Sequence, residues 1–203
     1  MDTNFNHEQS LTLINEMINR ARNNVGQKGA GSFVFIGYFV AILAVANSVL
    51  MQFLSNPLHS IFVWALMIPG CGVMYVIERR NFMKKLVITH IDKIGSMVWL
   101  AFFIGFMVFT VVIHTVNLKL NIFEIFMLNM PVMLVLLGMG QFISACVLRQ
   151  NMWYAVAAQS WAGAIICALI GVEAQFLVFA ACMFLGFAVP GHILNYQAKK
   201  SDV

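Results

Sequence analysis

The segment IGSMVWLAFFIGFMVFTVVIHT, residues 94–115, decides the fold because it contains no charged residue and few polar ones. A helix needs roughly 20 predominantly apolar residues to cross a bilayer. Five further segments of this kind lie between the charged clusters of the chain. The predicted membrane-spanning helices are 32–53, 58–77, 94–115, 122–148, 153–171 and 174–196.

The composition of the 203-residue chain agrees with this interpretation. Hydrophobic residues make up 61% and charged residues 10% of the chain, whereas soluble domains average about 45–50% and about 25%. A soluble enzyme domain, a disulfide-rich secreted module and a disordered tail are therefore excluded. We predict an all-α polytopic membrane protein with a head at 1–28, a six-helix transmembrane domain at 29–198 and a tail at 199–203.

The distribution of basic residues predicts the orientation. Short loops rich in Lys and Arg remain on the cytoplasmic side of a membrane. With the N-terminus inside, eleven of the 12 basic residues lie on that side and only Lys119 lies outside. We therefore expect both termini in the cytoplasm and the chain in the cytoplasmic (inner) membrane. Basic loops explain the positive charge, and no nucleic-acid partner is indicated.

The head carries an apolar stripe at helical spacing, which predicts an amphipathic cytoplasmic helix. Three surfaces could cover this stripe: the membrane interface, the inner face of the helix bundle, or a helix of a partner protein. The stripe consists of Leu11, Ile14, Ile18, Ala21 and Val25.

Prolines and small residues predict how the spans pack. Pro69, Pro131 and Pro190 fall inside spans, where each is expected to bend its helix. The segment 153–171 is rich in small residues such as Gly163, which let helices approach closely in lipid. We therefore predict that this segment is the most buried helix.

Uncharged amides are the polar residues inside the spans. Asp, Glu, Lys and Arg occur only near the span ends, which argues against a transporter that relies on buried charges. A buried amide either bonds to another helix or lines a small polar cavity. The candidate cavity-lining residues are Asn47, Asn129, Gln141 and Gln159.

Two histidines and two glutamates fall at the predicted outer ends of four spans. Imidazole and carboxylate groups can bind a divalent metal such as zinc. Ordinary polar residues at the membrane interface are the favoured interpretation, because the four come from separate helix ends without local ligand spacing. The candidate ligands are His59, His114, Glu124 and Glu173. The sequence contains no recognisable catalytic motif, so neither an enzyme nor a specific cofactor is predicted.

Several short motifs resemble a family of small bacterial six-helix inner-membrane proteins. These motifs are Thr89-His90-Ile91-Asp92 with Trp99, GMGQF at 138–142 and PGHIL at 190–194; the run Asn-Glu-Met-Ile at 15–18 of the head is similar too. The resemblance implies a location in the cytoplasmic membrane. No activity is assigned to that family, so the resemblance transfers no catalytic or binding residue.

Three functions remain open at this stage. The sequence favours an interaction or regulatory protein that acts through its cytoplasmic face on a protein partner or a second copy of itself. A carrier or channel for a small neutral or apolar solute is the alternative. A membrane protein that binds a metal or cofactor is the second alternative.

Overall fold

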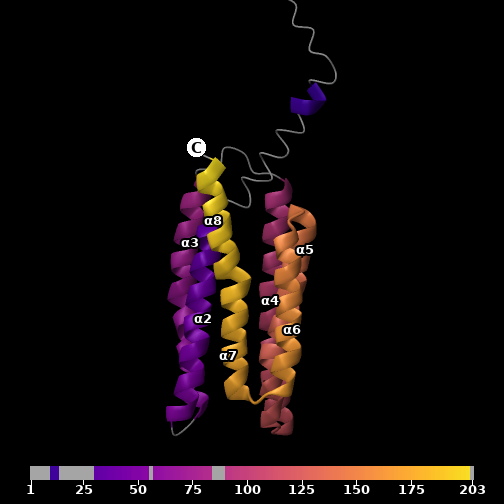
Figure 1. The fold of residues 1–203 in the computed structure, drawn as a ribbon. Coiled ribbons are helices and arrows are strands. Elements are labelled where there is room, and N and C mark those ends of the chain that lie inside the picture. The colour runs from indigo at the N-terminus through magenta and orange to yellow at the C-terminus, as the bar shows by residue number, and fades with distance from the viewer. Residues whose placement is uncertain (1–9, 14–29, 55–56, 84–89, 202–203) are drawn as a thin grey trace, which may run out of the picture.

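The computed structural model describes residues 10–13, 30–54, 57–83 and 90–201. These residues are almost entirely helical, and no strand occurs among them. Consecutive helices run up and down the molecule (Figure 1). In chain order the elements are α2 (Ala30–Phe53), η1 (Pro57–Leu66), α3 (Met67–Met83), α4 (His90–Leu120), η2 (Phe123–Leu128), α5 (Asn129–Leu148), α6 (Asn151–Leu169), α7 (Val172–Met183), η3 (Phe184–Ala188) and α8 (Val189–Ser201).

Within the described residues, five helical segments are long and apolar enough to cross a membrane. Each coincides with one of the predicted spans, and their ends differ from the prediction by at most five residues. The chain is therefore an all-helical protein with several candidate membrane-spanning helices. The five segments are Gly31–Phe53, Lys93–Leu120, Glu124–Leu148, Asn151–Leu169 and Val172–Gln197.

The predicted span at 58–77 forms two helical pieces instead of one long α-helix. The 3-10 helix η1 leads into α3, and the apolar part, Phe62–Ile77, is shorter than the other five segments. A 3-10 helix rises about 2.0 Å per residue, compared with about 1.5 Å in an α-helix. Each residue of η1 therefore extends farther along the helix axis than a residue of an α-helix does, so this segment covers a given length with fewer residues.

The three prolines within the predicted spans lie where the helix type changes. Pro69 follows η1 in the first turn of α3, and Pro131 follows η2 in the first turn of α5. Pro190 follows the π-helix η3 in the first turn of α8. The helical backbone continues through each of these junctions. A proline removes one backbone N–H from the helix and crowds the preceding turn, so each proline coincides with a change of helix type within a continuous segment.

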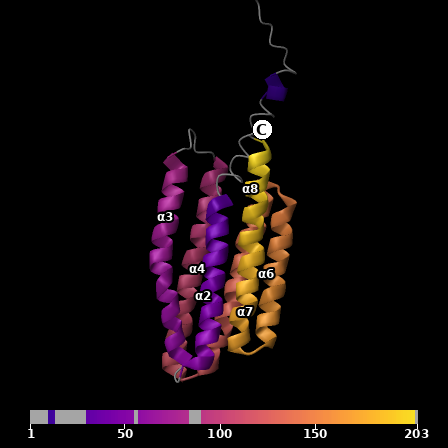
Figure 2. The same cartoon turned by 60° about the vertical axis from the view of Figure 1, so that its left-hand side comes forward.

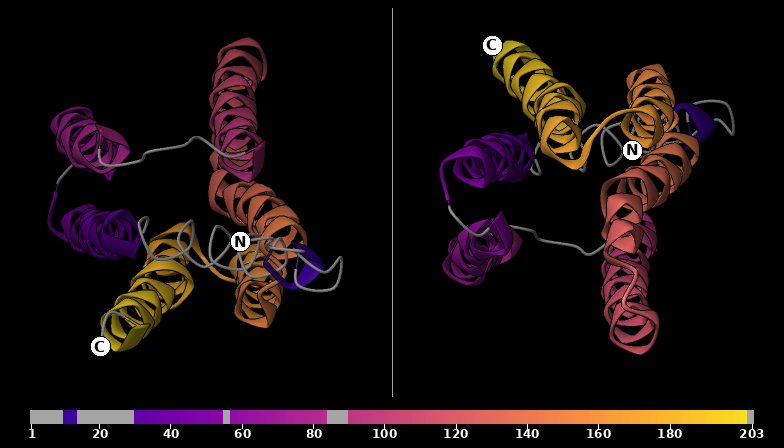
Figure 3. Two further views of the ribbon diagram at one scale, coloured as in Figure 1. Left: turned by 90° about the horizontal axis from the view of Figure 1, so that it is seen from above. Right: turned by 90° about the horizontal axis from the view of Figure 1, so that it is seen from below.

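The helices form a curved row that is open between its two ends. The most extensive contacts join α5 to α6 and α2 to α7. The row also includes contacts of α6 with α7 and of α4 with α5, whereas α3 contacts mainly α2 and η1. Figures 2 and 3 show α3 and α4 as the two ends of this row, with a wide separation between them.

Among the five candidate spans, the one in the middle of the row is the most buried. In the segment Val172–Gln197, 56% of the most apolar window is buried, compared with 39% in α6. The prediction that 153–171 is the most buried helix was therefore wrong. Gly163 does pack against another helix, but Ala168 is exposed, so only one side of α6 is covered. The segment from α7 to α8 is more buried because it packs against α2 on one side and α6 on the other.

Candidate ligand-binding cleft

A cleft of about 2460 Å³ lies inside the curved row of helices. One wall comes from α2, η1 and α3, the other from α4 and α5, and residues of α7 and η3 line its back. A pocket for a drug-sized ligand typically measures about 300–1,000 Å³. The cleft is therefore large enough for a ligand well above that size.

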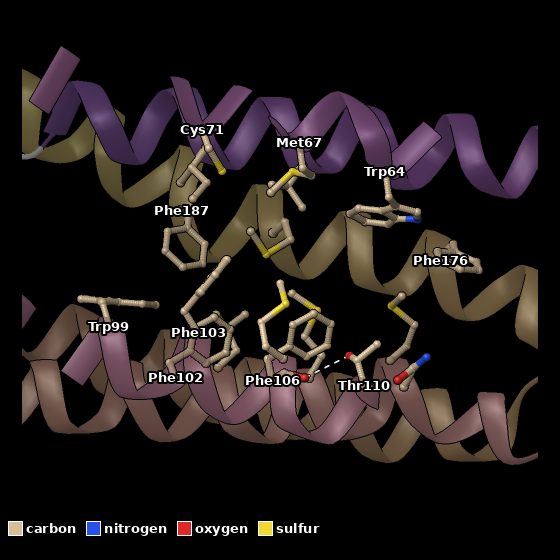
Figure 4. A pocket seen from close by; sticks show the side chains of 18 of the residues that line it. Trp64, Met67, Cys71, Trp99, Phe102, Phe103, Phe106, Thr110, Phe176 and Phe187 are labelled. Atoms are coloured by element: carbon tan, nitrogen blue, oxygen red, sulfur yellow. Dashed lines mark hydrogen bonds between the residues drawn. The ribbon is translucent and has the colours of Figure 1, made fainter. Parts of the chain in front are cut away.

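Aromatic and sulfur-containing side chains dominate the middle of the cleft. In Figure 4, Trp64, Met67 and Cys71 face the cleft from η1 and α3, opposite the side chains of α4. Several of these side chains are only partly covered by protein, and Phe103 is 48% exposed. Methionine is flexible and polarizable, which suits it to surfaces that accept apolar molecules of varied shape. The labelled aromatic residues of the other walls are Trp99, Phe102, Phe103, Phe106, Phe176 and Phe187.

One face of α4 lines the cleft from end to end. Its cleft residues recur every three or four positions, which places them on the same side of the helix. From Ser96 to Asn117 this face extends about 32 Å at 1.5 Å per residue, close to the roughly 30 Å hydrocarbon core of a bilayer. The face is formed by Ser96, Trp99, Phe103, Phe106, Thr110, His114 and Asn117.

This face was missed by sequence reasoning. The segment 94–115 is apolar on all sides, so the cleft face cannot be distinguished from the opposite face by hydrophobic periodicity. A useful signal was available in the aromatic residues at 99, 102, 103 and 106, which cluster toward one side of a helix. Aromatic spacing, rather than hydrophobicity, therefore marks the cleft wall in the sequence.

Charged side chains line the cleft only at its two ends. Arg79 near the end of α3 and Lys93 in the first turn of α4 lie at the same end, because the two helices are consecutive and antiparallel. Glu124 and Glu173 lie at the other end. The long apolar section between these ends has no full charge among the lining residues.

Two of the four candidate amides line the cleft. Asn47 and Asn129 do so, and the Oδ1 atom of each is buried without a hydrogen-bond partner in the described structure. Gln141 lies between α5 and α6, where it accepts a hydrogen bond from Ser160. Gln159 donates to the carbonyl oxygen of Cys182 at 3.4 Å. The amides therefore divide between the two roles that the sequence left open.

The four candidate metal ligands are not gathered into one site. Within the described chain, no group of three or more His, Cys, Asp or Glu residues is placed to hold a metal ion. His114, Glu124 and Glu173 line the cleft, but His59 does not. His114 uses Nδ1 to contact the carbonyl oxygen of Thr110 at 2.9 Å. These side chains therefore give no geometric support to the metal hypothesis.

The predicted stripe of the head falls mostly outside the described residues. Leu11 is described and is 61% exposed. Ile14, Ile18, Ala21 and Val25 lie outside the described residues.

The fold and the cleft define an all-helical chain with five candidate membrane-spanning helices and a large apolar cleft between them. The chain matches no protein-family model, no curated protein and no solved structure in the comparisons made.

Proposed function

We propose that this protein takes up an apolar molecule from the bilayer and holds it in the cleft, as a carrier for a neutral or apolar solute does. The observation that carries this proposal is a cleft of about 2460 Å³ with many aromatic and methionine side chains on its walls. Their exposure ranges from 3% for Phe187 at the back to 48% for Phe103 on α4. Filling such a cleft with water would be unfavourable because apolar surface is hydrated at a cost of about 25 cal/mol per Å². An apolar ligand removes that cost.

The separation of α3 and α4 supports access from the side. Neither helix packs extensively on the other, and Figure 3 shows the two helices well apart. Because residues of both helices line the cleft, we infer that the cleft opens between them. An apolar molecule in the bilayer could therefore enter without passing through water. The uncharged middle section would at the same time disfavour an ion, since a charge at the centre of a membrane costs at least about 2.5 kcal/mol.

We propose that the chain crosses the membrane six times. In addition to the five long helical segments, η1 and α3 together form one crossing, the second in chain order. The protein lies in the cytoplasmic membrane with both termini in the cytoplasm. Arg79, Lys93 and Arg149 lie at the end of the bundle proposed to face inward. Lys119 lies at the other end with Glu124. A membrane-impermeant thiol reagent added to intact cells should label a cysteine placed at Lys119 but not one placed at Arg80.

We prefer the carrier function to the regulatory function favoured by the sequence. The regulatory hypothesis depends on the head, of which the structure describes only residues 10–13. The carrier hypothesis depends on a cleft that is formed by described residues, among them residues of α2, α3, α4, α5 and α7. A lipid, a second copy or a protein partner remains compatible with the exposed apolar faces outside the cleft.

Tryptophan substitutions test the carrier proposal. Thr110 lines the cleft, whereas Val108 on the same helix is 57% exposed and does not line it. Native mass spectrometry of the gently extracted protein should show that Thr110→Trp lowers retained apolar ligand at least about fivefold and that Val108→Trp does not. Cys71→Trp fills the cleft from the opposite wall and should act like Thr110→Trp. Equal retention in all three variants would contradict the proposal.

A further inference from the structure

The cleft has a different charge at each end. Arg79 and Lys93 line one end, and Glu124 and Glu173 line the other. A molecule that fills the cleft therefore meets positive charge at one membrane surface and negative charge at the opposite surface. This asymmetry favours one orientation for any ligand with a charged group.

The basic end has one cation on each of two facing walls of the cleft. Arg79 belongs to the α3 wall and Lys93 to the α4 wall, so the two cations approach the cleft from opposite sides. Both side chains are exposed, and neither forms an ion pair with another described residue. Arginine can bind a phosphate or carboxylate through two parallel hydrogen bonds, and lysine adds a compact positive charge.

We infer that the ligand is an anionic membrane lipid whose head group lies between Arg79 and Lys93 and whose acyl chains extend along the apolar walls of α3 and α4. This inference rests on the proposed function. The apolar section beyond the two cations is lined by Met67, Phe103 and Phe106, among others. Glu124 and Glu173 at the far end would repel the reverse orientation.

Arg80 and Arg149 provide a matched control. Both are exposed cations at the basic end of the bundle, but neither lines the cleft. The full chain is reconstituted in vesicles with equal amounts of phosphatidylglycerol and phosphatidylcholine that have identical acyl chains. After mild detergent extraction, native mass spectrometry measures the ratio of the two lipids retained by each protein molecule.

The wild-type protein should retain phosphatidylglycerol over phosphatidylcholine by about tenfold, the ratio expected when one charge-assisted contact distinguishes two ligands. Arg79→Gln combined with Lys93→Gln should lower that ratio to below about twofold. Arg80→Gln combined with Arg149→Gln should leave it within about twofold of the wild-type value. Circular dichroism of each variant confirms that its helices are retained.

Three results would overturn the inference. If the two double variants lose the preference equally, the effect comes from general surface charge. If the wild-type protein retains both lipids without any preference, the inference of an anionic ligand is wrong, while the carrier proposal stands. If the protein is a dimer that retains no lipid, a second copy occupies the cleft and both proposals fail.

Discussion

The hydroxyl group of Ser160 on α6 donates a 2.7 Å hydrogen bond to Oε1 of Gln141 on α5, and both residues are fully buried. This bond joins two neighbouring helices through side chains that are both 0% exposed. The Nε2 atom of Gln141 has no hydrogen-bond partner in the described structure. The α5–α6 pair, which supports the α4 wall of the cleft, is therefore held partly by this buried bond. Hydrogen bonds from Trp161 Nε1 to the carbonyl oxygen of Val135 and from the Tyr154 hydroxyl to Cys146 Sγ join the same two helices.

Ser160→Ala should destabilise the protein by about 1 kcal/mol, because hydrogen bonds between membrane helices contribute about 0.6–2 kcal/mol. The free energy of unfolding in mixed detergent micelles measures the effect. Ser144→Ala is the control, since Ser144 bonds only to the carbonyl oxygen of Gly140 in its own helix. In a double-mutant cycle, Gln141→Met should remove most of the cost of Ser160→Ala. Independent effects of the two substitutions would show that the contact contributes nothing.

Gly37 of α2 lies against Ala188, the last residue of η3. A Cβ atom at this position would collide with the backbone nitrogen of Ala188, which cannot rotate away. Gly37→Ala should therefore cost about 1–3 kcal/mol, as overpacking usually does. A Cβ at Gly105 meets no atom within 4 Å, so Gly105→Ala should stabilise α4 by about 0.5–1 kcal/mol. Thermal unfolding distinguishes the two variants, and a tolerated Gly37→Ala would mean that α2 and η3 are farther apart.

The side chain of Gln175 stabilises the turn between α6 and α7 through a hydrogen bond. Its Nε2 atom donates to the carbonyl oxygen of Cys167 at 2.8 Å, and the side chain is only 1% exposed. Gln175→Ala leaves that buried carbonyl oxygen without this donor and should destabilise the protein by about 1–3 kcal/mol. The exposed Gln197 provides the comparison. If Gln197→Ala shifts the unfolding temperature as much as Gln175→Ala does, the turn does not depend on this bond.

Two exposed native cysteines can report on the cleft. Cys71 lines the cleft, whereas Cys146 is exposed outside it. A bound ligand slows modification of a covered thiol by the factor 1 + [L]/Kd. With lipid at about ten times its Kd, an apolar maleimide should react about tenfold more slowly with Cys71 and at an unchanged rate with Cys146. Each rate is measured in a variant that has the other cysteine replaced by Ser. Equal slowing of both thiols would place the lipid around the whole protein.

Hydropathy predicted most of the fold because the bilayer requires long apolar segments. The ends of segments such as 32–53 and 153–171 agree with the structure to within a few residues. The change from the 3-10 helix η1 to the α-helix α3 was not predicted, because hydropathy does not distinguish between types of helix. The high burial of the segment from α7 to α8 was also missed. Burial depends on how many neighbouring helices a segment has in the row, and not on its small residues alone.

The candidate site was predictable only in part. The sequence allowed each buried amide either to line a cavity or to bond to another helix. Asn47 and Asn129 line the cleft, whereas Gln141 bonds to Ser160 on α6. The apolar wall of α4 gave no signal in hydrophobicity, since lipid and an apolar ligand favour the same residues. The role of Arg79 was equally hidden, because Arg80 beside it has the same charge and lies outside the cleft.

The central claim is that the space between α3 and α4 holds an apolar ligand. A high-resolution density map of the protein in a lipid nanodisc, with an antibody fragment bound to add mass, tests it most directly. We predict elongated non-protein density between Met67 and Phe103, continuous toward Arg79 and Lys93. Direct packing of α3 against α4 with no space between them, or a helix of a second copy in the cleft, would contradict the account.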